Sequence, residues 1–389
     1  MQLASIFVLL LHLVCYHHTA ADGLCQAVCT GTGEKRKCVF EFSLDFFASE
    51  TGYFKVKGCP GTMPTLAMES NVEYTFIQTD ETNWMHPLGF GYFPDGAHKN
   101  VDELEPRVNP LNKACVTNST CQHPLYFGGD AGLTFLGMSP VAETENFGLD
   151  VYEPEFKKSL QNWKKNQYNV KLTISDQSTS DIFYFCHLHD NMSGRIKVLD
   201  ENGEPRSIDD KPPLGYTYQS LDSFDSACGT HDVSRYQNSS SLCPDMTFLC
   251  GVNASMTSAK KTFGECMIAL DCAMHVEMRV NIQEDPIVTF IHQMIPHHRN
   301  AVNMAKVLLK HGQITDANDP DGDLVAMLWN IVNTQNEQIT FMRSWLKTYN
   351  KKSTDSCQHV GPKGDPSPNA ASFNLPKTIY LLIFLFFNY

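Results

Sequence analysis

The sequence predicts a multidomain β plus α protein, in which an antiparallel β-sandwich or barrel precedes a helical region. A chain of 389 residues is long enough for two or three domains at about 150 residues each. Short segments with alternating apolar residues dominate the first 200 residues, whereas long segments with helical periodicity follow residue 226. Hydrophobic residues make up 42% and charged residues 19%, which is typical of globular rather than disordered chains.

Both ends of the chain carry targeting signals. Residues 1–21 contain an apolar run and end in small residues, a pattern typical of a secretory signal peptide. The run is too short for a membrane span, which needs about 20 apolar residues. After a linker over 351–371, small residues beginning at Asn369 and a terminal apolar run predict a GPI-attachment signal over 372–389. The alternative is a plain hydrophobic tail. We therefore expect a secreted or cell-surface protein that meets the membrane through a lipid anchor only.

The charge balance argues against one class of partner. The chain has 30 Lys and Arg against 43 Asp and Glu, a formal net charge of -13. Such an acidic protein lacks the basic surplus that attracts phosphate backbones, so we expect no nucleic-acid partner.

The cysteines fit an oxidising compartment. Cys15 leaves with the signal peptide, so 13 of the 14 cysteines remain, an odd number. Twelve of them fall into three even groups, which allow six local disulfides, and Cys186 is left over for another role. The groups are Cys25, Cys29, Cys38 and Cys59; Cys115 and Cys121; and Cys228, Cys243, Cys250, Cys266, Cys272 and Cys357. Four glycosylation sequons agree with the secretory route: Asn118, Asn191, Asn238 and Asn253.

The segment 22–200 is predicted as one β domain. Its strands are recognised by alternating apolar residues between Gly and Pro. Residues 94–165 are less regular and are predicted as an insertion. The expected strands are Val39–Phe46, Val72–Ile77, Tyr168–Ile174, Ile182–Phe185 and Ile196–Leu199.

A short loop after the strand that ends at Cys186 carries the most specific motif. Cys186, His189 and Met192 follow one another at three-residue spacing, and Gly194 allows a turn into the next strand. A thiolate, an imidazole and a thioether on one loop, with a second imidazole from an upstream strand end, are the ligands of a blue-copper site. His86 fits the place of the second imidazole, and Met192 that of the weak axial ligand.

The Cys-x-x-His-x-x-Met spacing resembles that of the amicyanin-type small blue copper proteins, which are cupredoxins, over roughly residues 36–200. The resemblance implies a Greek-key β-sandwich that binds one copper ion through His86, Cys186, His189 and Met192. The insertion departs from the small-cupredoxin pattern. His187 is expected to face outward, and with one His-x-His pair in the chain a trinuclear oxygen-reducing centre is not expected. The alternative is that Cys186 is a buried thiol and the histidines are packing residues.

After a linker over 201–225, residues 226–350 are predicted as a disulfide-rich helical bundle. Asp285 before Pro286 is typical of a helix start, and Gly312 of a helix end. A second helix is expected over Asp323–Tyr349 and a shorter one over Cys266–Val280.

Met and His residues share one side of the first of these helices. On a helical projection Met294, His297 and Met304 lie together, with His298 beside them. Thioethers and imidazoles suit copper, and the scarcity of carboxylates argues against magnesium or a di-iron centre. The alternative for such a stripe is core packing. Further candidate ligands on the other helices are Met274, His275, Met278 and Met342.

The run Met294–Ala305, followed by Gln-x-x-Gln-Ile-x-x-Met-x-x-Trp-Leu, resembles a family of ferritin-like bundles catalogued as a domain of unknown function. Its bacterial members include periplasmic copper-binding proteins of the CopM type. The resemblance covers roughly residues 265–349 and implies a ferritin-like, copper-binding bundle. Gln338 stands where the family usually has Glu, which argues against a role that needs a carboxylate there.

Together these features predict an extracellular, cell-surface copper-binding protein with copper as its cofactor. It would have one blue-copper site and one His/Met site, and would bind, buffer or transfer copper, with a redox or copper-transfer protein as its partner. The alternatives are a one-electron transfer protein, a copper-dependent oxidoreductase, and an adhesion or matrix protein with retired metal sites. No catalytic residue is predicted.

Overall fold

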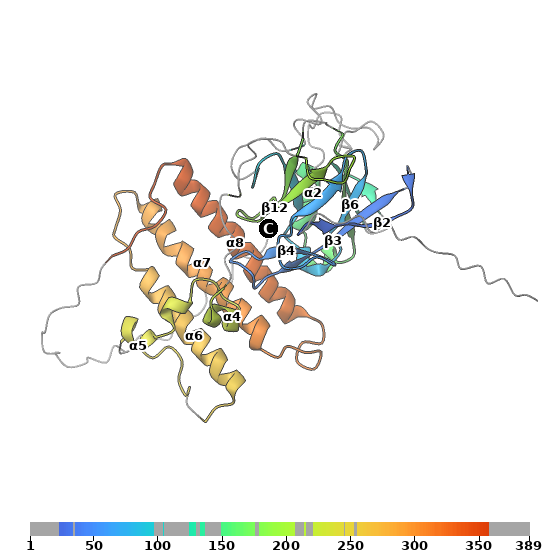
Figure 1. Cartoon of the computed structure of the whole chain (residues 1–389). Coiled ribbons are helices and arrows are strands. Elements are labelled where there is room, and N and C mark those ends of the chain that lie inside the picture. Colours follow the sequence, from blue (N-terminus) through green and yellow to red (C-terminus); the bar gives the residue numbers. More distant parts are fainter. Residues whose placement is uncertain are drawn as a thin grey trace, which may run out of the picture.

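The structure is a computed structural model that describes most of the predicted β and helical regions. The described residues are 23–33, 36–96, 104, 124–129, 133–136, 149–175, 179–206, 214, 221–244, 246–252 and 255–357. Strands gather on one side and three long helices on the other (Figure 1). The prediction of a β region followed by a helical region is confirmed. The predicted signal peptide, Asn118, Asn253, Asn369 and the segment 372–389 lie outside the described residues.

The described strands form two sheets. One has the order β1-β5-β12-β11-β7, and the other has the order β2-β3-β6-β10-β8-β9, with β4 paired to β3. Rings from facing strands meet between the sheets: Phe42 lies 5.4 Å from Tyr184, and Phe76 lies 4.8 Å from Phe90. The strands are β1 Cys25–Gln26, β2 Val28–Thr30, β3 Lys37–Asp45, β4 Tyr53–Val56, β5 Leu66–Glu69, β6 Tyr74–Ile77, β7 Leu88–Gly91, β8 Leu125–Gly129, β9 Thr134–Phe135, β10 Gln167–Leu172, β11 Asp181–Cys186 and β12 Ser193–Leu199.

The sheets are mixed, so the expectation of an antiparallel β region was wrong in part. Strand β5 runs parallel to both β1 and β12, and β3 runs parallel to β6. Alternating apolar residues indicate which face of a strand is buried, but not the direction of its neighbour. The five expected strands all occur, with ends shifted by a few residues.

The helices are α2 Leu149–Phe156, α3 Leu160–Trp163, α4 Ser223–Cys228, α5 Ser239–Leu242, α6 Ser258–Glu277, α7 Pro286–His311 and α8 Asp323–Thr348. Helix α7 begins and ends as predicted, and the Asp285 carboxylate accepts a hydrogen bond from the Ile287 amide. Helix α6 starts eight residues earlier than predicted. Among the described residues, no helix is long and apolar enough to cross a membrane.

Four disulfides join described residues, which is consistent with a secreted or extracellular protein. They are Cys25–Cys59, Cys29–Cys38, Cys228–Cys266 and Cys243–Cys272. Cys115 and Cys121 lie outside the described residues. Cys250 and Cys357 are exposed and not joined, contrary to the expected pairing. Cys250 lies near the first half of α6, whereas the amide of Cys357 binds the carbonyl of Arg279 beyond its last turn.

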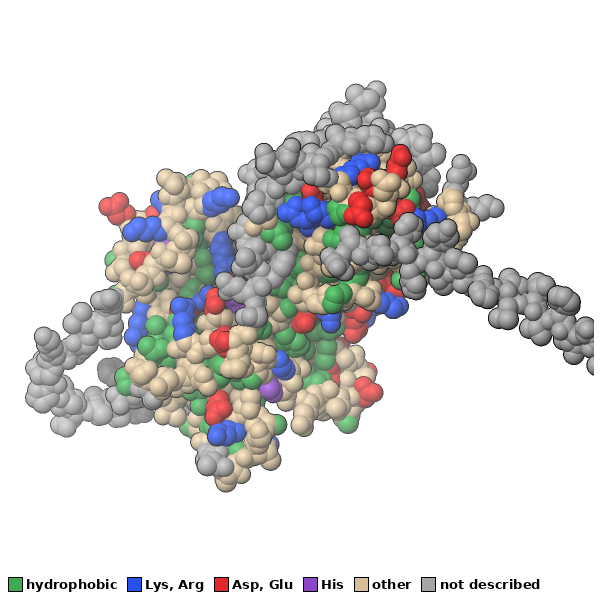
Figure 2. Space-filling model, in the orientation of Figure 1, with side chains coloured by type: hydrophobic (Ala, Val, Ile, Leu, Met, Phe, Trp, Pro, Cys, Tyr) green, Lys and Arg blue, Asp and Glu red, His purple; other side chains and the backbone are tan. Residues whose placement is uncertain are grey.

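The helical region packs directly on the β region. Val302 on α7 and Trp329 and Val332 on α8 belong to the same buried cluster as the β-sheet core. The buried Lys306 ammonium donates to the carbonyls of Ser49 and Glu50, in the loop between β3 and β4, at 2.7 and 2.9 Å. Charged side chains of both signs lie over both regions on the face in Figure 2. Helices α7 and α8 are both held against the β region by these contacts.

Candidate metal centre

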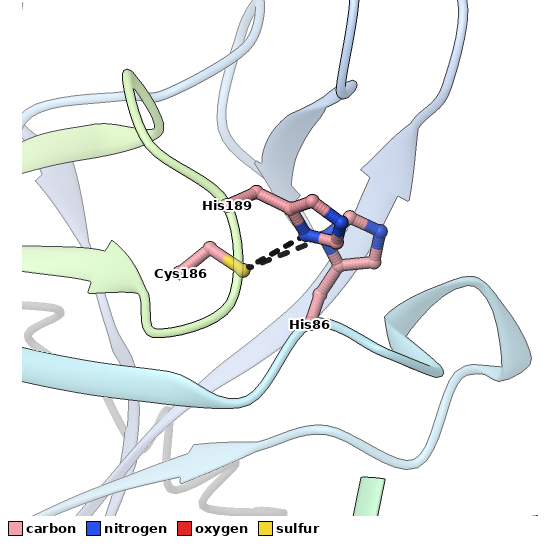
Figure 3. A group of neighbouring side chains, drawn as sticks. All are labelled: His86, Cys186 and His189. Carbon is pink, nitrogen blue, oxygen red and sulfur yellow. Dashed lines mark hydrogen bonds between the residues drawn. The ribbon is translucent and has the colours of Figure 1, made fainter. Parts of the chain in front are cut away.

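Two adjacent strands bring together three of the predicted ligands. Cys186 ends β11 and pairs with Leu88, the first residue of β7, so that His86 arrives beside the thiol. His189 comes from the loop between β11 and β12. The Cys186 Sγ lies 3.6 Å from His86 Nδ1 and 3.4 Å from His189 Nδ1 (Figure 3). All three side chains are fully buried, and their ligand atoms lie within 4.8 Å of one another.

Met192 lies on the same loop and is fully buried. Its carbonyl accepts a hydrogen bond from the Cys186 amide at 3.2 Å, which closes the loop. The carboxylate of the buried Asp95 accepts from the Met192 amide at 3.2 Å and from the Ser193 hydroxyl at 2.8 Å. Asp95 therefore anchors the ligand loop, a role that the sequence reasoning missed.

Buried amides hold His86 in place from the β region. The His86 amide donates to the Asn83 carbonyl at 2.8 Å. The Gln78 amide group donates to the His86 carbonyl at 2.8 Å, and its oxygen accepts from the Leu88 amide at 2.9 Å. Gln78 and Asn83 were not predicted. The sequence feature that could have indicated Gln78 is its position as a polar residue directly after the apolar strand β6.

Helix α8 covers the opposite side of both rings. The Asn333 Oδ1 lies 3.1 Å from His86 Nε2, and the Asn333 carbonyl oxygen lies 3.4 Å from His189 Nε2. Asn333 is itself fully buried. It lies 144 residues after His189 in the chain, so no local sequence pattern could predict this contact.

The site favours uncharged side chains in the absence of a cation. Burial raises the pKa of the Cys186 thiol to about 12. Burial, and then the neighbouring His189, hold the pKa of His86 well below its usual range. A metal cation that displaced the thiol proton would supply the charge that the thiolate needs.

The spacing of the donor atoms fits a single metal ion. Metal–nitrogen bonds of about 2.0 Å and metal–sulfur bonds of about 2.3 Å place nitrogen and sulfur roughly 3.5 Å apart at a tetrahedral angle. The two Sγ–Nδ1 separations of 3.6 and 3.4 Å match that value. A thiolate and two imidazoles, with a thioether on the same loop, suit copper, and the first three also suit zinc.

His187 does not face outward, contrary to expectation. It is half-buried and its Nδ1 binds the Glu153 carboxylate on α2. Burial alone would raise the pKa of Glu153, but His187 and then Lys157 lower it to about 2. The sequence gives no sign of this pair, because α2 lies within the predicted insertion.

The Met and His side chains of the helical region have different surroundings. Met294 and Met342 pack in an apolar cluster with Val288 and Ile291. His297 is exposed and His298 is half-buried, with their ring centroids 5.8 Å apart.

Helix α6 contacts α7 near Asn300 and Met304, whereas Met294 of α7 packs with residues of α8. The Asn300 amide donates to the Met274 sulfur at 3.3 Å and to the Met304 sulfur at 3.5 Å. The His275 ring lies 6.3 Å from that of Phe248, and Met278 is half-buried at the end of α6. Four of the candidate Met residues therefore have two kinds of neighbour: apolar side chains at Met294 and Met342, and the Asn300 amide at Met274 and Met304.

Two predicted sequons lie within the described residues. Asn191 is exposed beside the ligand loop and has a positive φ of 58°. Asn238 is exposed before α5.

Comparisons with known proteins give a separate match for each region. A family model described as a domain of unknown function, DUF305, matches residues 287–373, which contain α7 and α8. Among solved structures, rusticyanin from Thiobacillus ferrooxidans is 14% identical, with 44% of this chain and 85% of that chain covered and a TM-score of 0.19. A second rusticyanin structure, described as that of a copper protein, is 14% identical over 44% of this chain and 86% of that chain, with a TM-score of 0.20. No curated protein matches the chain.

Proposed function

We propose that this protein binds one copper ion through His86, Cys186, His189 and Met192 and acts in extracellular copper handling. The observation that carries the proposal is a fully buried thiol within 3.6 Å of two imidazole Nδ1 atoms. Bound copper would supply reversible one-electron chemistry. The protein residues hold the ion, exclude water and fix the rings.

The cover provided by α8 favours copper handling over electron exchange with a protein partner. Both ligand rings are fully buried, and both Nε2 atoms face Asn333 rather than solvent. A partner protein would therefore find no exposed imidazole edge at which to dock. Binding or storage of copper needs no such edge, because exchange can be slow.

Metal analysis of the full secreted chain tests the proposal. After loading with equal amounts of copper and zinc and removal of loosely bound ions, the wild type should retain one more copper per chain than Cys186→Ser. Cys250→Ser is the matched control, because that thiol is exposed and remote from the ligands. Retention of zinc in place of copper, or equal copper in wild type and Cys186→Ser, would overturn the assignment.

We also propose a cell-surface location through a GPI anchor at Asn369. The terminal sequence pattern supports it, and the four disulfides agree with an oxidising compartment. A phospholipase that cleaves phosphatidylinositol should release the protein from cells. Release by mechanical shearing alone, or retention after phospholipase treatment, would count against the anchor.

A second, weaker copper site is proposed between α6 and α7. Its basis is the pair of thioethers at Met274 and Met304, which share the Asn300 amide. His297 lies about one turn before Asn300 and two turns before Met304 on α7. Thioethers favour Cu(I). In a background in which Cys186, Cys250 and Cys357 are replaced by Ser, so that these thiols cannot bind Cu(I), replacement of Met274 and Met304 by Leu should lower the affinity for Cu(I). Replacement of Met294 and Met342 is the control, because these two pack in an apolar cluster. Equal Cu(I) affinity in both double variants would contradict this site.

A further inference from the structure

We infer that Asn333 is a positioning residue for the metal centre, through which metal occupancy is coupled to the packing of the helical region on the β region. The part of the inference that concerns metal occupancy rests on the proposed function, whereas the role of Asn333 does not. Its structural basis is a set of hydrogen bonds between one helix residue and both histidine ligands.

The amide of Asn333 has a defined orientation. Its Nδ2 donates to the Trp84 carbonyl oxygen at 3.2 Å, and a carbonyl can only accept. The nitrogen must therefore face Trp84, which turns Oδ1 towards His86 Nε2 at 3.1 Å. The main-chain carbonyl of the same residue faces His189 Nε2 at 3.4 Å.

These contacts select one tautomer for both rings. The two Asn333 oxygens are acceptors, so each ring must carry its proton on Nε2. The Nδ1 atom of each ring then carries the lone pair, and it faces the Cys186 sulfur. Asn333 thus presents both imidazoles in the form that a metal ion requires.

Asn333 is held there by the face of α8 that packs on the β region. Trp329, one turn earlier, lies 5.6 Å from the Phe46 ring. Asn336, one turn later, is buried and its amide donates to the Glu50 carbonyl at 3.0 Å. If α8 leaves the β region, both rings lose their Nε2 acceptors together. A metal ion that binds the packed state more tightly must therefore stabilise that packing.

The first test uses the tautomers of the metal-free protein, at a pH where both rings are neutral. Nitrogen NMR of the wild type should show His86 and His189 with the proton on Nε2. In Asn333→Ala, His86 should become a mixture of tautomers, whereas His189 should stay unchanged because its acceptor is a main-chain carbonyl. Asn330→Ala is the matched control, because Asn330 is exposed on α8 and its side chain contacts Thr334, and it should leave both rings as in the wild type. Unchanged His86 in Asn333→Ala would overturn the inference, and so would an equal change in both variants.

The second test uses metal binding. Loss of a partner that orients a ligand typically lowers metal affinity about 10- to 100-fold. We expect such a loss in Asn333→Ala and less than about 3-fold in the exposed control Asn330→Ala. Asn333→Asp keeps the acceptor for His86 and should retain the Nε2 tautomer, which tests the role of the acceptor if the alanine variant folds poorly.

Metal loading should also slow hydrogen exchange in α8 of the wild type, and exchange that is indifferent to metal would contradict the coupling. If the wild type binds no copper, the proposed function fails, but the tautomer test still decides the role of Asn333.

Discussion

At the scale of single residues, Gly194 provides space beside the ligand loop. We expected it to allow a turn, but it lies in β12 directly opposite Tyr184. A Cβ at Gly194 would overlap the ring of Tyr184. That ring is fully buried, and its hydroxyl donates to the Pro64 carbonyl at 2.8 Å, so it cannot move aside freely.

Gly194→Ala should therefore lower the free energy of unfolding by about 1–3 kcal/mol, as overpacking of a buried site usually does. Urea denaturation of the metal-free protein measures the change without interference from metal binding. Tyr184→Leu removes the clash, so the double variant should be more stable than the sum of the two single effects predicts. Strict additivity would show that the two residues do not compete for space.

Glycosylation of Asn191 is a second prediction at the scale of single residues. Asn191 is exposed and directly precedes the buried Met192. An occupied sequon beside the ligand loop would hold a protein partner away, which suits copper handling better than rapid electron exchange. We expect peptide mapping of the native protein to find Asn191 glycosylated. Full occupancy together with fast electron exchange with a protein partner would favour the electron-carrier alternative.

The sequence indicates the ligands themselves because their spacing and their positions beside recognisable strands are local features of the chain. Cys186, His189 and Met192 share one loop with the required spacing, and His86 follows a recognisable strand. Residues that support them were missed, since Asp95 and Asn333 act across 97 and 247 residues of chain. Such contacts depend on the packing of whole elements and leave no periodic pattern.

At the scale of elements, a half-buried ion pair joins α8 to the loop between β3 and β4. The Arg343 guanidinium donates to both carboxylate oxygens of Glu50, at 2.9 and 3.1 Å. Burial would raise the pKa of Glu50, but the charge and hydrogen bonds of Arg343 lower it below its usual value of 4.5. The ionised form of Glu50 therefore stabilises the packing of the two regions.

Glu50→Gln should lower the free energy of unfolding by about 2 kcal/mol at neutral pH, since a hydrogen-bonded charge is lost. Because the folded pKa of Glu50 is depressed, its contribution is present above pH 4.5 and is lost as the pH falls through the folded value. The difference between wild type and variant should thus shrink in acid. Glu337→Gln, which removes a more exposed pair with Lys157, is the control and should cost about 0–1 kcal/mol. A difference for Glu50→Gln that is constant with pH would contradict this account.

The limits of α7 were predictable from the sequence, whereas the start of α6 was not. Asp285, Pro286 and Gly312 are local signals, and α7 begins and ends where they indicate. The parallel pairing of β5 with β12 was not predictable, because it joins segments more than 120 residues apart. The same holds for the division of the Met and His residues of α7 between its two neighbouring helices.

At the scale of the whole molecule, the two regions share one hydrophobic core and one candidate metal centre. Val302, Trp329 and Val332 of the helical region are buried with the β core. We therefore expect the two regions to unfold in a single transition, with helical signal and aromatic signal lost at the same denaturant concentration. Two separate transitions would show that each region is stable alone, and that the shared core contributes little.

The central claim is a copper centre built on the Cys186 thiolate, and the visible absorption spectrum of the Cu(II)-loaded full chain tests it most directly. We predict an intense thiolate-to-copper band in the wild type and in Cys250→Ser, and its loss in Cys186→Ser. A wild type without this band, or a Cys186→Ser protein that keeps it, would contradict the account.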